Sequence, residues 1–463
     1  MNTITPNLDY LSNIPLYVQI YEYIKNEVLD GRITPHEKLP SIRELSKILS
    51  LSKTTVASSY DQLLVEGYIY SKPQSGYYAN NISKGLSVPS KLYSPYLEVA
   101  QSKNLQDRFT DISSFDFIKW KKCLNRVIND DRHSLLSEAS PQGEKALRNE
   151  ISKYVYQSRG ATCTPEQIVI GAGTQQIMSL LGVILEGIGI HHVAFEDPGY
   201  YPARKIFSDR GFSISPVSVE KDGINMKELR KSMCSMIYVS PSHQFPLGSV
   251  MPIGKRYELL EWAYDVNGII IEDDYDSELR YYGRPVPSLQ GLDQKEKVVY
   301  LGSFSTTLLP SIKISYIILP QSMLSCYQNV MNNYSQTCSK IEQLTLALYM
   351  KEGYYQKQIK KLRKLYTSKV QLLVDCIQKE MKGFVRVLSH TSGLHVLLEI
   401  DSEKPVEKLC DEAAASKLDA IPIEKYMIRK REKAIPVILL YYTQIPLAQI
   451  PLAIHHLKET WQK

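Results

Sequence analysis

From about residue 107 to the C-terminus, short apolar segments alternate with longer amphipathic ones. The strand-like segments QIVIGAG, HVAFEDPGYY, MIYVSPSHQFPLG, GIIIEDDYDSEL and VVYLGSFS each end in a polar loop, and helix-like segments separate most of them. Alternation on this scale predicts an α/β fold with a large, mostly parallel sheet and helices on both faces. From about residue 360, the strands SGLHVLLEI and PVILLYY and amphipathic helices predict a smaller α/β lobe. Ligands of such sheets bind where the strands end, so a site is expected in the polar loops.

The first eighty residues follow a different pattern. Leu16, Ile20, Ile24 and Val28 are spaced as one face of a helix, and Gly31 is a natural stop just after it. Two shorter helical segments follow, LPSIRELSKILS and LSKTTVASSYDQLLVEGYI, and then YIYSKPQSGYYA predicts two short strands around a turn. Three helices and a hairpin predict a winged helix-turn-helix, whose third helix enters the major groove of DNA.

Hydroxyls and cations gather where this module would meet DNA. Small helical domains that bind nothing show similar patterns, and residues 13–80 carry seven Lys or Arg against seven Asp or Glu, so charge alone does not decide. The placement of the polar residues favours phosphate and base contacts at helix starts and in the wing. The residues expected at DNA are Ser41, Arg43, Ser52, Lys53, Thr54, Thr55, Lys72 and Gly76.

The stretch 13–81 resembles the GntR family of bacterial regulators. The strings LPS-x-REL, LS-K-TTV and L-x-x-EGYI and the wing glycine Gly76 match the family in order. The resemblance implies a double-stranded DNA operator as partner. Lys53 stands where the family usually has arginine, and lysine reaches a phosphate but cannot read a base edge with two parallel hydrogen bonds.

Between the two patterns, residues 82–106 are polar, contain Pro and Gly, and have weak periodicity, which predicts a flexible linker with one helical turn at most. The remainder, 107–463, is expected to be one effector and dimerisation domain. Seven scattered cysteines without a C-x-x-C pair predict reduced thiols in a cytoplasmic protein and no zinc site. Neither a signal peptide nor a membrane-spanning run is evident, so no membrane partner is expected.

Four loops after the predicted strands carry side chains suited to a phosphorylated ligand. Each signal is weak alone, because a Gly turn is usually only a turn and an acidic cluster is most often solvated or a metal site. Asp273 and Tyr275 lie two residues apart at a strand end, so both side chains are expected to point the same way. Ser303, Ser305 and Lys313 supply donors for an anion.

The ordered set resembles fold-type I aminotransferases, which bind pyridoxal 5′-phosphate. With the N-terminal module, it resembles the MocR/GabR subfamily of GntR regulators over nearly the whole chain. The matching strings are PQGEKALRNEI, GAGTQQ, EDPGYY, PSHQFPLGSVMP, IEDDYDSELRYYGRPVPSLQGLD, YLGSFS, LLPSIKISYIILP and SGLH. The resemblance implies that the phosphate is held by Gly173, Thr174, Gln175, Ser303, Ser305 and Lys313.

The same resemblance implies contacts to the pyridine ring. Tyr200 would stack on it, Asp273 would pair with its nitrogen and keep the ring an electron sink, and Tyr275 would bond its hydroxyl. His243 or Gln244 would line the edge of the ring.

Three positions depart from the aminotransferase pattern. Thr306 stands where the family has the lysine that forms the Schiff base and carries the proton, and a hydroxyl can do neither. Glu138 stands where a tyrosine usually reaches the cofactor. No arginine appears in AIPVILLYYTQIP to clamp a substrate carboxylate, and Arg429 and Arg431 lie upstream. The three departures together indicate a site no longer used for catalysis.

The leading hypothesis is a bacterial DNA-binding transcriptional regulator, expected to be a homodimer. Its aminotransferase-like domain would bind, or once have bound, pyridoxal phosphate non-covalently and a small amine or amino-acid effector. One rival is a working aminotransferase with a DNA-binding appendage, which Thr306 disfavours. The other is a regulator whose large domain serves only as a dimerisation scaffold.

Overall fold

The chain divides into two compact units, Met1–Gln101 and Ser102–Lys463. The computed structural model describes residues 6, 8–9, 14–82, 111, 114–130, 132–281, 286–331, 334–416, 418–429 and 435–462. The expected linker, 82–106, lies outside the described residues except for its first position. Each unit is described below by itself.

The N-terminal unit is a winged helix-turn-helix, as the sequence predicts. Its elements are α1 (Leu16–Leu29), α2 (Ile42–Ile48), α3 (Lys53–Val65), β1 (Ile69–Lys72) and β2 (Gly76–Ala79). Ser41 and Glu44 form the capping box at the start of α2, which satisfies two amide groups the helix leaves unpaired. The two strands pair antiparallel and make the wing.

One apolar core holds the three helices and the wing together. Ile20 and Ile24 of α1, Leu45 of α2, and Val56 and Leu63 of α3 are fully buried in it. Burial of each such side chain contributes about 1.5–3 kcal/mol. Because these residues lie on the inner face of each helix, their packing fixes the orientation of α3 relative to α1 and α2.

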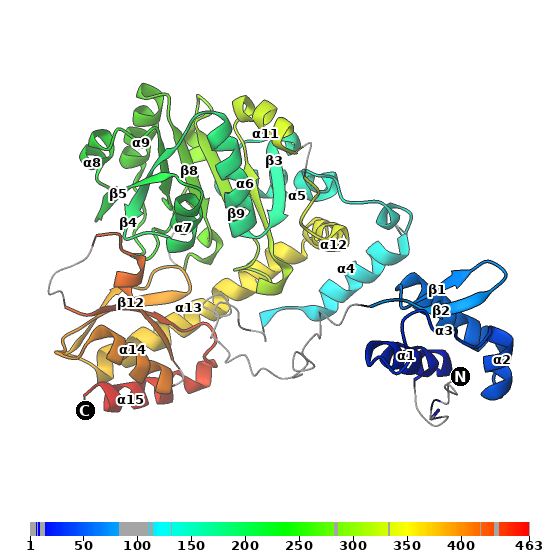
Figure 1. The fold of residues 1–463 in the computed structure, drawn as a ribbon. Coiled ribbons are helices and arrows are strands. Elements are labelled where there is room, and N and C mark those ends of the chain that lie inside the picture. The colour runs from blue at the N-terminus through cyan, green and yellow to red at the C-terminus, as the bar shows by residue number, and fades with distance from the viewer. Residues whose placement is uncertain are drawn as a thin grey trace. The chain divides into compact units, whose positions relative to one another are not determined.

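The C-terminal unit is built on a mixed, mostly parallel sheet of eight strands (Figure 1). The strands are β3 (Ile168–Ala172), β4 (His192–Asp197), β5 (Ser213–Glu220), β6 (Gly223–Ile224), β7 (Met236–Val239), β8 (Ile269–Asp274), β9 (Val298–Ser303) and β10 (Ile314–Ile318). Their order is β3-β10-β9-β8-β7-β4-β5-β6. The run from β9 to β5 is parallel, whereas β10 is antiparallel to both β9 and β3. The end of β3 and the start of β10 therefore lie at the same edge as the ends of the parallel strands.

Helices cover both faces of this sheet (Figure 1). Along β8, Ile269 and Ile271 pack in one core and Ile270 in another, because successive side chains of a strand point to opposite faces. The first face carries α6 (Thr174–Gly187), α7 (Tyr201–Asp209) and α11 (Leu324–Met331). The other carries α5 (Lys145–Arg159), α8 (Met226–Lys231), α9 (Ile253–Asp265), α10 (Leu289–Leu292) and α12 (Lys340–Lys351), with α4 (Phe117–Asp130) packed on α12.

The smaller lobe has its own antiparallel sheet, ordered β11-β12-β14-β13. Its strands are β11 (Val385–Ser389), β12 (His395–Ile400), β13 (Asp419–Pro422) and β14 (Val437–Tyr441), and its helices are α14 (Val406–Ala415) and α15 (Ile450–Trp461). The long helix α13 (Tyr354–Glu380) contacts both α12 and this lobe (Figure 1). The 3-10 turns are Ser134–Leu136, Pro165–Gln167, Ser277–Leu279, Pro310–Ile312, Gln321–Met323, Ile423–Tyr426 and Leu447–Gln449. Among the described helices, none is long and apolar enough to cross a membrane.

Candidate functional site

The first part of the site is a cradle between β3 and β10. Gly173 precedes α6 with φ +84°, a backbone conformation that favours glycine, and it has no side chain to cap the helix. The first amide groups of α6 are therefore open to an anion. A Cβ built on Gly173 would lie 3.7 Å from Cδ of Lys313, so the lysine stem runs beside this helix start. Gln175 is exposed in the first turn of α6.

Hydroxyl groups from three segments line the same cradle. The Ser315 hydroxyl donates to Ser303 Oγ at 2.9 Å and lies 3.5 Å from Oγ1 of Thr174. Ser303 Oγ also accepts from the backbone amide of Ser305 at 3.3 Å. Ser315 was not singled out from the sequence. It lies opposite Ser303 in the pairing of β9 and β10, and this strand pairing is what reveals it as part of the cradle.

The acidic motif IEDDYD at the end of β8 contains three carboxylates that have hydrogen-bond or ion-pair partners within the fold. Glu272 accepts hydrogen bonds from the first two backbone amides of α10, both at 2.9 Å. Asp274 forms a buried ion pair with Arg159 at 2.7 Å. Asp276 lies 2.8 Å from Nδ1 of His243, and both side chains are buried. These three carboxylates therefore stabilise the fold at this edge of the sheet.

Asp273 is the remaining carboxylate of the stretch IEDDYD (residues 271–276) and is differently placed. Among the described residues, its one side-chain hydrogen bond comes from the Tyr238 hydroxyl. The pKa of Asp273 is raised to about 7, chiefly by burial and also by the nearby charges of Asp274 and Asp276, while the hydrogen bond from Tyr238 lowers it. A buried carboxylate without a cationic partner favours a bound cation, such as a protonated ring nitrogen.

A second buried carboxylate lies behind Asp273. One oxygen of Glu196 accepts from the Ser240 amide at 3.1 Å and the Ser240 hydroxyl at 2.8 Å, and within the described structure the other oxygen has no hydrogen-bond partner. Burial raises the pKa of Glu196 to about 7, and the charge of Asp273 adds to the shift. When ionised, the carboxylates of Asp273 and Glu196 give this edge of the sheet a negative electrostatic potential.

Tyr275 connects the β8 and β9 loops. Its hydroxyl lies 2.9 Å from Nδ1 of His243, and its carbonyl accepts from the Thr306 hydroxyl at 2.8 Å. Burial raises the pKa of Tyr275 well above its usual value, so it remains a phenol. Thr306 is half-buried, and its hydroxyl is bonded to the segment that follows β8.

Tyr200 and Gln244 contribute differently to the same edge. The Tyr200 ring meets Phe245 edge-on at 5.9 Å, and after burial the charge of Asp273 is the next cause that raises the pKa of Tyr200. The Gln244 amide donates to the Pro198 carbonyl at 2.9 Å and accepts from the Leu247 amide at 3.1 Å. Gln244 therefore stabilises the loop that contains it. Tyr200 lies near enough to Asp273 for that charge to raise its pKa.

The other residues named with the departures from the aminotransferase pattern, apart from Thr306, have surroundings of their own. Glu138 is exposed, and its carbonyl accepts from Lys340 Nζ at 3.3 Å. The Arg429 guanidinium bonds Ser218 at 2.8 Å and Glu228 at 3.1 Å, so it is engaged at β5. Arg431 lies outside the described residues.

The donor set at the strand ends fits a phosphorylated pyridine. The cradle offers helix amides, three hydroxyl groups and one lysine for the phosphate, and Asp273 offers a carboxylate for the ring nitrogen. Tyr200 supplies an aromatic face, and Tyr275 supplies a phenol.

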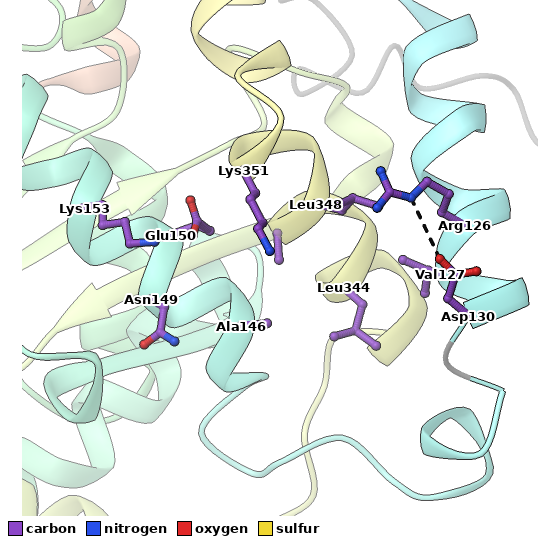
Figure 2. Close-up of a pocket in the computed structure, with 11 residues that line it drawn as sticks. Arg126, Val127, Asp130, Ala146, Asn149, Glu150, Lys153, Leu344, Leu348 and Lys351 are labelled. Carbon is purple, nitrogen blue, oxygen red and sulfur yellow. Dashed lines mark hydrogen bonds and ion pairs between the residues drawn. The ribbon is translucent and has the colours of Figure 1, made fainter.

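A separate groove of about 450 Å³ lies among α4, α5 and α12 (Figure 2). Four of its charged residues form two ion pairs: Arg126 lies 3.9 Å from Asp130, and Lys153 lies 2.7 Å from Glu150, while Lys351 also lines the groove. The rest of the wall is largely aliphatic, with Leu344 prominent in the view. None of the residues predicted to hold the ligand lines this groove.

The start of α3 is organised for a polyanion. The Ser52 side chain accepts from the Thr55 amide at 3.1 Å and lies 2.7 Å from the Thr54 hydroxyl and 2.8 Å from the Thr55 hydroxyl. Capping thus uses the third amide of the helix and leaves those of Lys53 and Thr54 at its exposed tip. Arg43 is exposed on α2, the other helix of the motif.

The wing carries a cation over aromatic rings. Lys72 Nζ lies 4.9 Å from the centre of the Tyr78 ring and 5.8 Å from that of Tyr70. Gly76 begins β2 with φ +112°, and a Cβ there would lie 3.4 Å from Lys38 Cε. The turn therefore needs glycine and brings a second lysine to the hairpin.

Comparisons with known proteins agree with this architecture. Residues 16–78 match the family of bacterial regulatory proteins, gntR family, and residues 108–429 match aminotransferase class I and II. The kynurenine aminotransferase of Pyrococcus horikoshii superposes with a TM-score of 0.68 and 21% identity, covering 77% of this chain and 89% of that one. That likeness shows the fold.

Relatives extend over both units. The chain is 39% identical to the uncharacterized HTH-type transcriptional regulator YdeL of Bacillus subtilis, covering 99% of each chain. It is 30% identical to the probable rhizopine catabolism regulatory protein MocR of Rhizobium meliloti, over 84% of this chain and 83% of that one. It is also 30% identical to the pyridoxine biosynthesis transcriptional regulator PdxR of Corynebacterium glutamicum, over 88% of each.

A GntR-type winged helix joined to an aminotransferase-fold domain defines a class of bacterial transcriptional regulator. The predicted fold class is therefore confirmed. Within that class, the chain belongs to the MocR/GabR-type subfamily of GntR regulators.

Proposed function

We propose that the aminotransferase-like domain is a sensor that holds a vitamin B6 phosphate without a covalent bond and adjusts operator binding in response. The observation that carries this proposal is the cradle of Thr174, Ser303 and Lys313 together with the buried carboxylate of Asp273 at the strand ends. Thr306 stands where the family resemblance places the lysine, so this position lacks the amine.

The chain's own residues have separable tasks in this proposal. The start of α6 and Lys313 bind the phosphate, since helix amides and a cation complement its charge. Asp273 pairs with the ring nitrogen, and Tyr275 contacts the ring hydroxyl. When bound, pyridoxal phosphate supplies an electron-withdrawing ring and an aldehyde that reacts with amines. An amine or amino-acid effector would therefore meet the ligand at Thr306.

A working aminotransferase is the less supported alternative. Transamination requires a group that accepts and returns a proton beside the reacting carbon, and a threonine hydroxyl is far too weak a base. The guanidinium of Arg429 is also engaged with Glu228 and Ser218. A pure scaffold is the second alternative, and it would not require an unpaired buried carboxylate at Asp273.

We also propose that the protein acts as a homodimer on double-stranded DNA in the cytoplasm. Two winged modules in one dimer would read paired half-sites. Light scattering of the full chain at micromolar concentration tests this, and a monomer would contradict it.

The central experiment uses the full chain as purified. Its operator is first selected from random double-stranded DNA, and the dissociation constant is then measured with and without pyridoxal 5′-phosphate and a panel of amines. We expect the ligand to bind reversibly and to change operator affinity. A pocket that takes up no B6 phosphate, with DNA binding intact, would leave the scaffold alternative.

A further inference from the structure

We propose that Thr306 makes this site selective for a B6 phosphate that carries an amine at C4′, represented by pyridoxamine 5′-phosphate, over the aldehyde. This inference rests on the proposed B6-phosphate site and specifies its ligand.

The hydrogen-bond direction at Thr306 is set by the protein. Its hydroxyl has one hydrogen, and that hydrogen is donated to the Tyr275 carbonyl at 2.8 Å. A carbonyl oxygen can only accept, so the direction of this bond is unambiguous. Toward a ligand, Thr306 Oγ1 therefore offers lone pairs and no donor.

An amine and an aldehyde differ at this point. A protonated amine donates, so it satisfies the free lone pairs of Thr306 with a charge-assisted hydrogen bond. An aldehyde oxygen is itself an acceptor, so it finds an acceptor where it needs a donor. A hydroxymethyl group, as in pyridoxine 5′-phosphate, donates without charge and should be intermediate.

The charges around the site act in the same direction. Asp273 lacks a cationic partner, and Glu196 keeps one buried oxygen unpartnered among the described residues. The Arg159 guanidinium is paired with Asp274, and the His243 ring is bonded to Asp276. In the usual family arrangement a lysine would add positive charge here, and its replacement leaves the buried acids to be balanced by the ligand.

The test compares three ligands in equilibrium dialysis with the full chain: pyridoxamine 5′-phosphate, pyridoxine 5′-phosphate and pyridoxal 5′-phosphate. We expect the amine to bind at least about tenfold more tightly than the aldehyde, since a hydrogen bond to a charged group is stronger than one between neutral groups. Equal binding, or tighter binding of the aldehyde, would overturn the inference while leaving the B6 site intact.

Two variants identify the cause. Thr306→Ser keeps the hydroxyl and should keep the preference for the amine. Thr306→Val keeps the shape but removes the acceptor, so the preference should fall several-fold, with thermal unfolding used to confirm that each variant is folded. Retention of the full preference in Thr306→Val would overturn the assignment to Thr306. Binding of none of the three ligands to the unmodified chain would instead refute the proposed sensor site itself.

Discussion

Tyr238 on β7 donates its hydroxyl hydrogen to the carboxylate of Asp273 on β8, and both side chains are buried. The phenol helps to keep this carboxylate in place but does not neutralise it. Burial therefore dominates, and the pKa of Asp273 rises from 3.8 to about 7.

This pKa predicts a specific dependence of stability on pH. In the unfolded chain Asp273 loses its proton near pH 4, whereas in the folded protein it keeps the proton until about pH 7. The folded state then binds more protons, so the free energy of unfolding falls as pH rises between those values, by up to about 1.4 kcal/mol per pH unit for each such group. Urea unfolding from pH 4 to pH 8 measures the slope.

Asp273→Asn is the matched variant for that measurement. It keeps the shape and cannot titrate, so we expect a shallower slope, with the contribution of Glu196 remaining because the pKa of Glu196 is also about 7. Superimposable pH profiles for the two proteins would contradict the prediction.

Lys313→Asn tests the phosphate cradle. Lys313 has a left-handed backbone with φ 51°, which asparagine tolerates well, so the loop should keep its form while the positive charge is lost. We expect the dissociation constant for pyridoxamine 5′-phosphate to rise about tenfold or more, as for a lost charge-assisted hydrogen bond. Pyridoxamine without its phosphate is the control, and its weak binding should be unaffected. An equal loss for both ligands would place the effect outside the cradle.

Thr306→Lys tests whether the pocket is intact. We expect this variant to capture pyridoxal 5′-phosphate covalently, so that borohydride reduction leaves a pyridoxyl adduct on residue 306, detected by peptide mass spectrometry. Rapid transamination should not return, because Glu138 is exposed and Arg429 is engaged elsewhere. The unmodified chain should carry no adduct in this loop. An adduct on Lys313 in the unmodified chain would contradict the non-covalent site.

Lys53→Ala tests the DNA interface. Lys53 is exposed at the tip of α3, so its loss should weaken binding across DNA sequences and reduce the slope of log affinity against log salt by about 1. Arg32→Ala is a control with the same charge change, since Arg32 forms ion pairs with Glu27 and Asp30. Unchanged affinity in folded Lys53→Ala protein would argue against this docking.

Local patterns in the sequence were sufficient for most of the secondary structure. The capping box of Ser41 and Glu44 and the strand-then-loop segments of the large sheet depend on residues a few positions apart, and the structure contains them. Strand β5 was not predicted, because Pro216 and its serines interrupt the pattern. Pro216 is tolerated because β5 pairs with β4 there while β6 pairs only farther along at Val219 and Glu220, which leaves Pro216 at an open edge.

The sequence by itself determined the two kinds of domain. It also predicted that the site lies at the strand ends and that Thr306 stands at the position of the lysine. Only the tertiary structure decided which acid of the IEDDYD motif has no cationic partner among the described residues and can therefore pair with a ligand. Arg159, which neutralises Asp274, is 115 residues away in the chain, and His243, which pairs with Asp276, is 33 residues away. Spacing along the chain cannot assign such partners, since electrostatic and hydrogen-bond energies depend on distance in space. For the same reason, the direction of the Thr306 hydroxyl, and with it the inferred choice of ligand, was set by the fold.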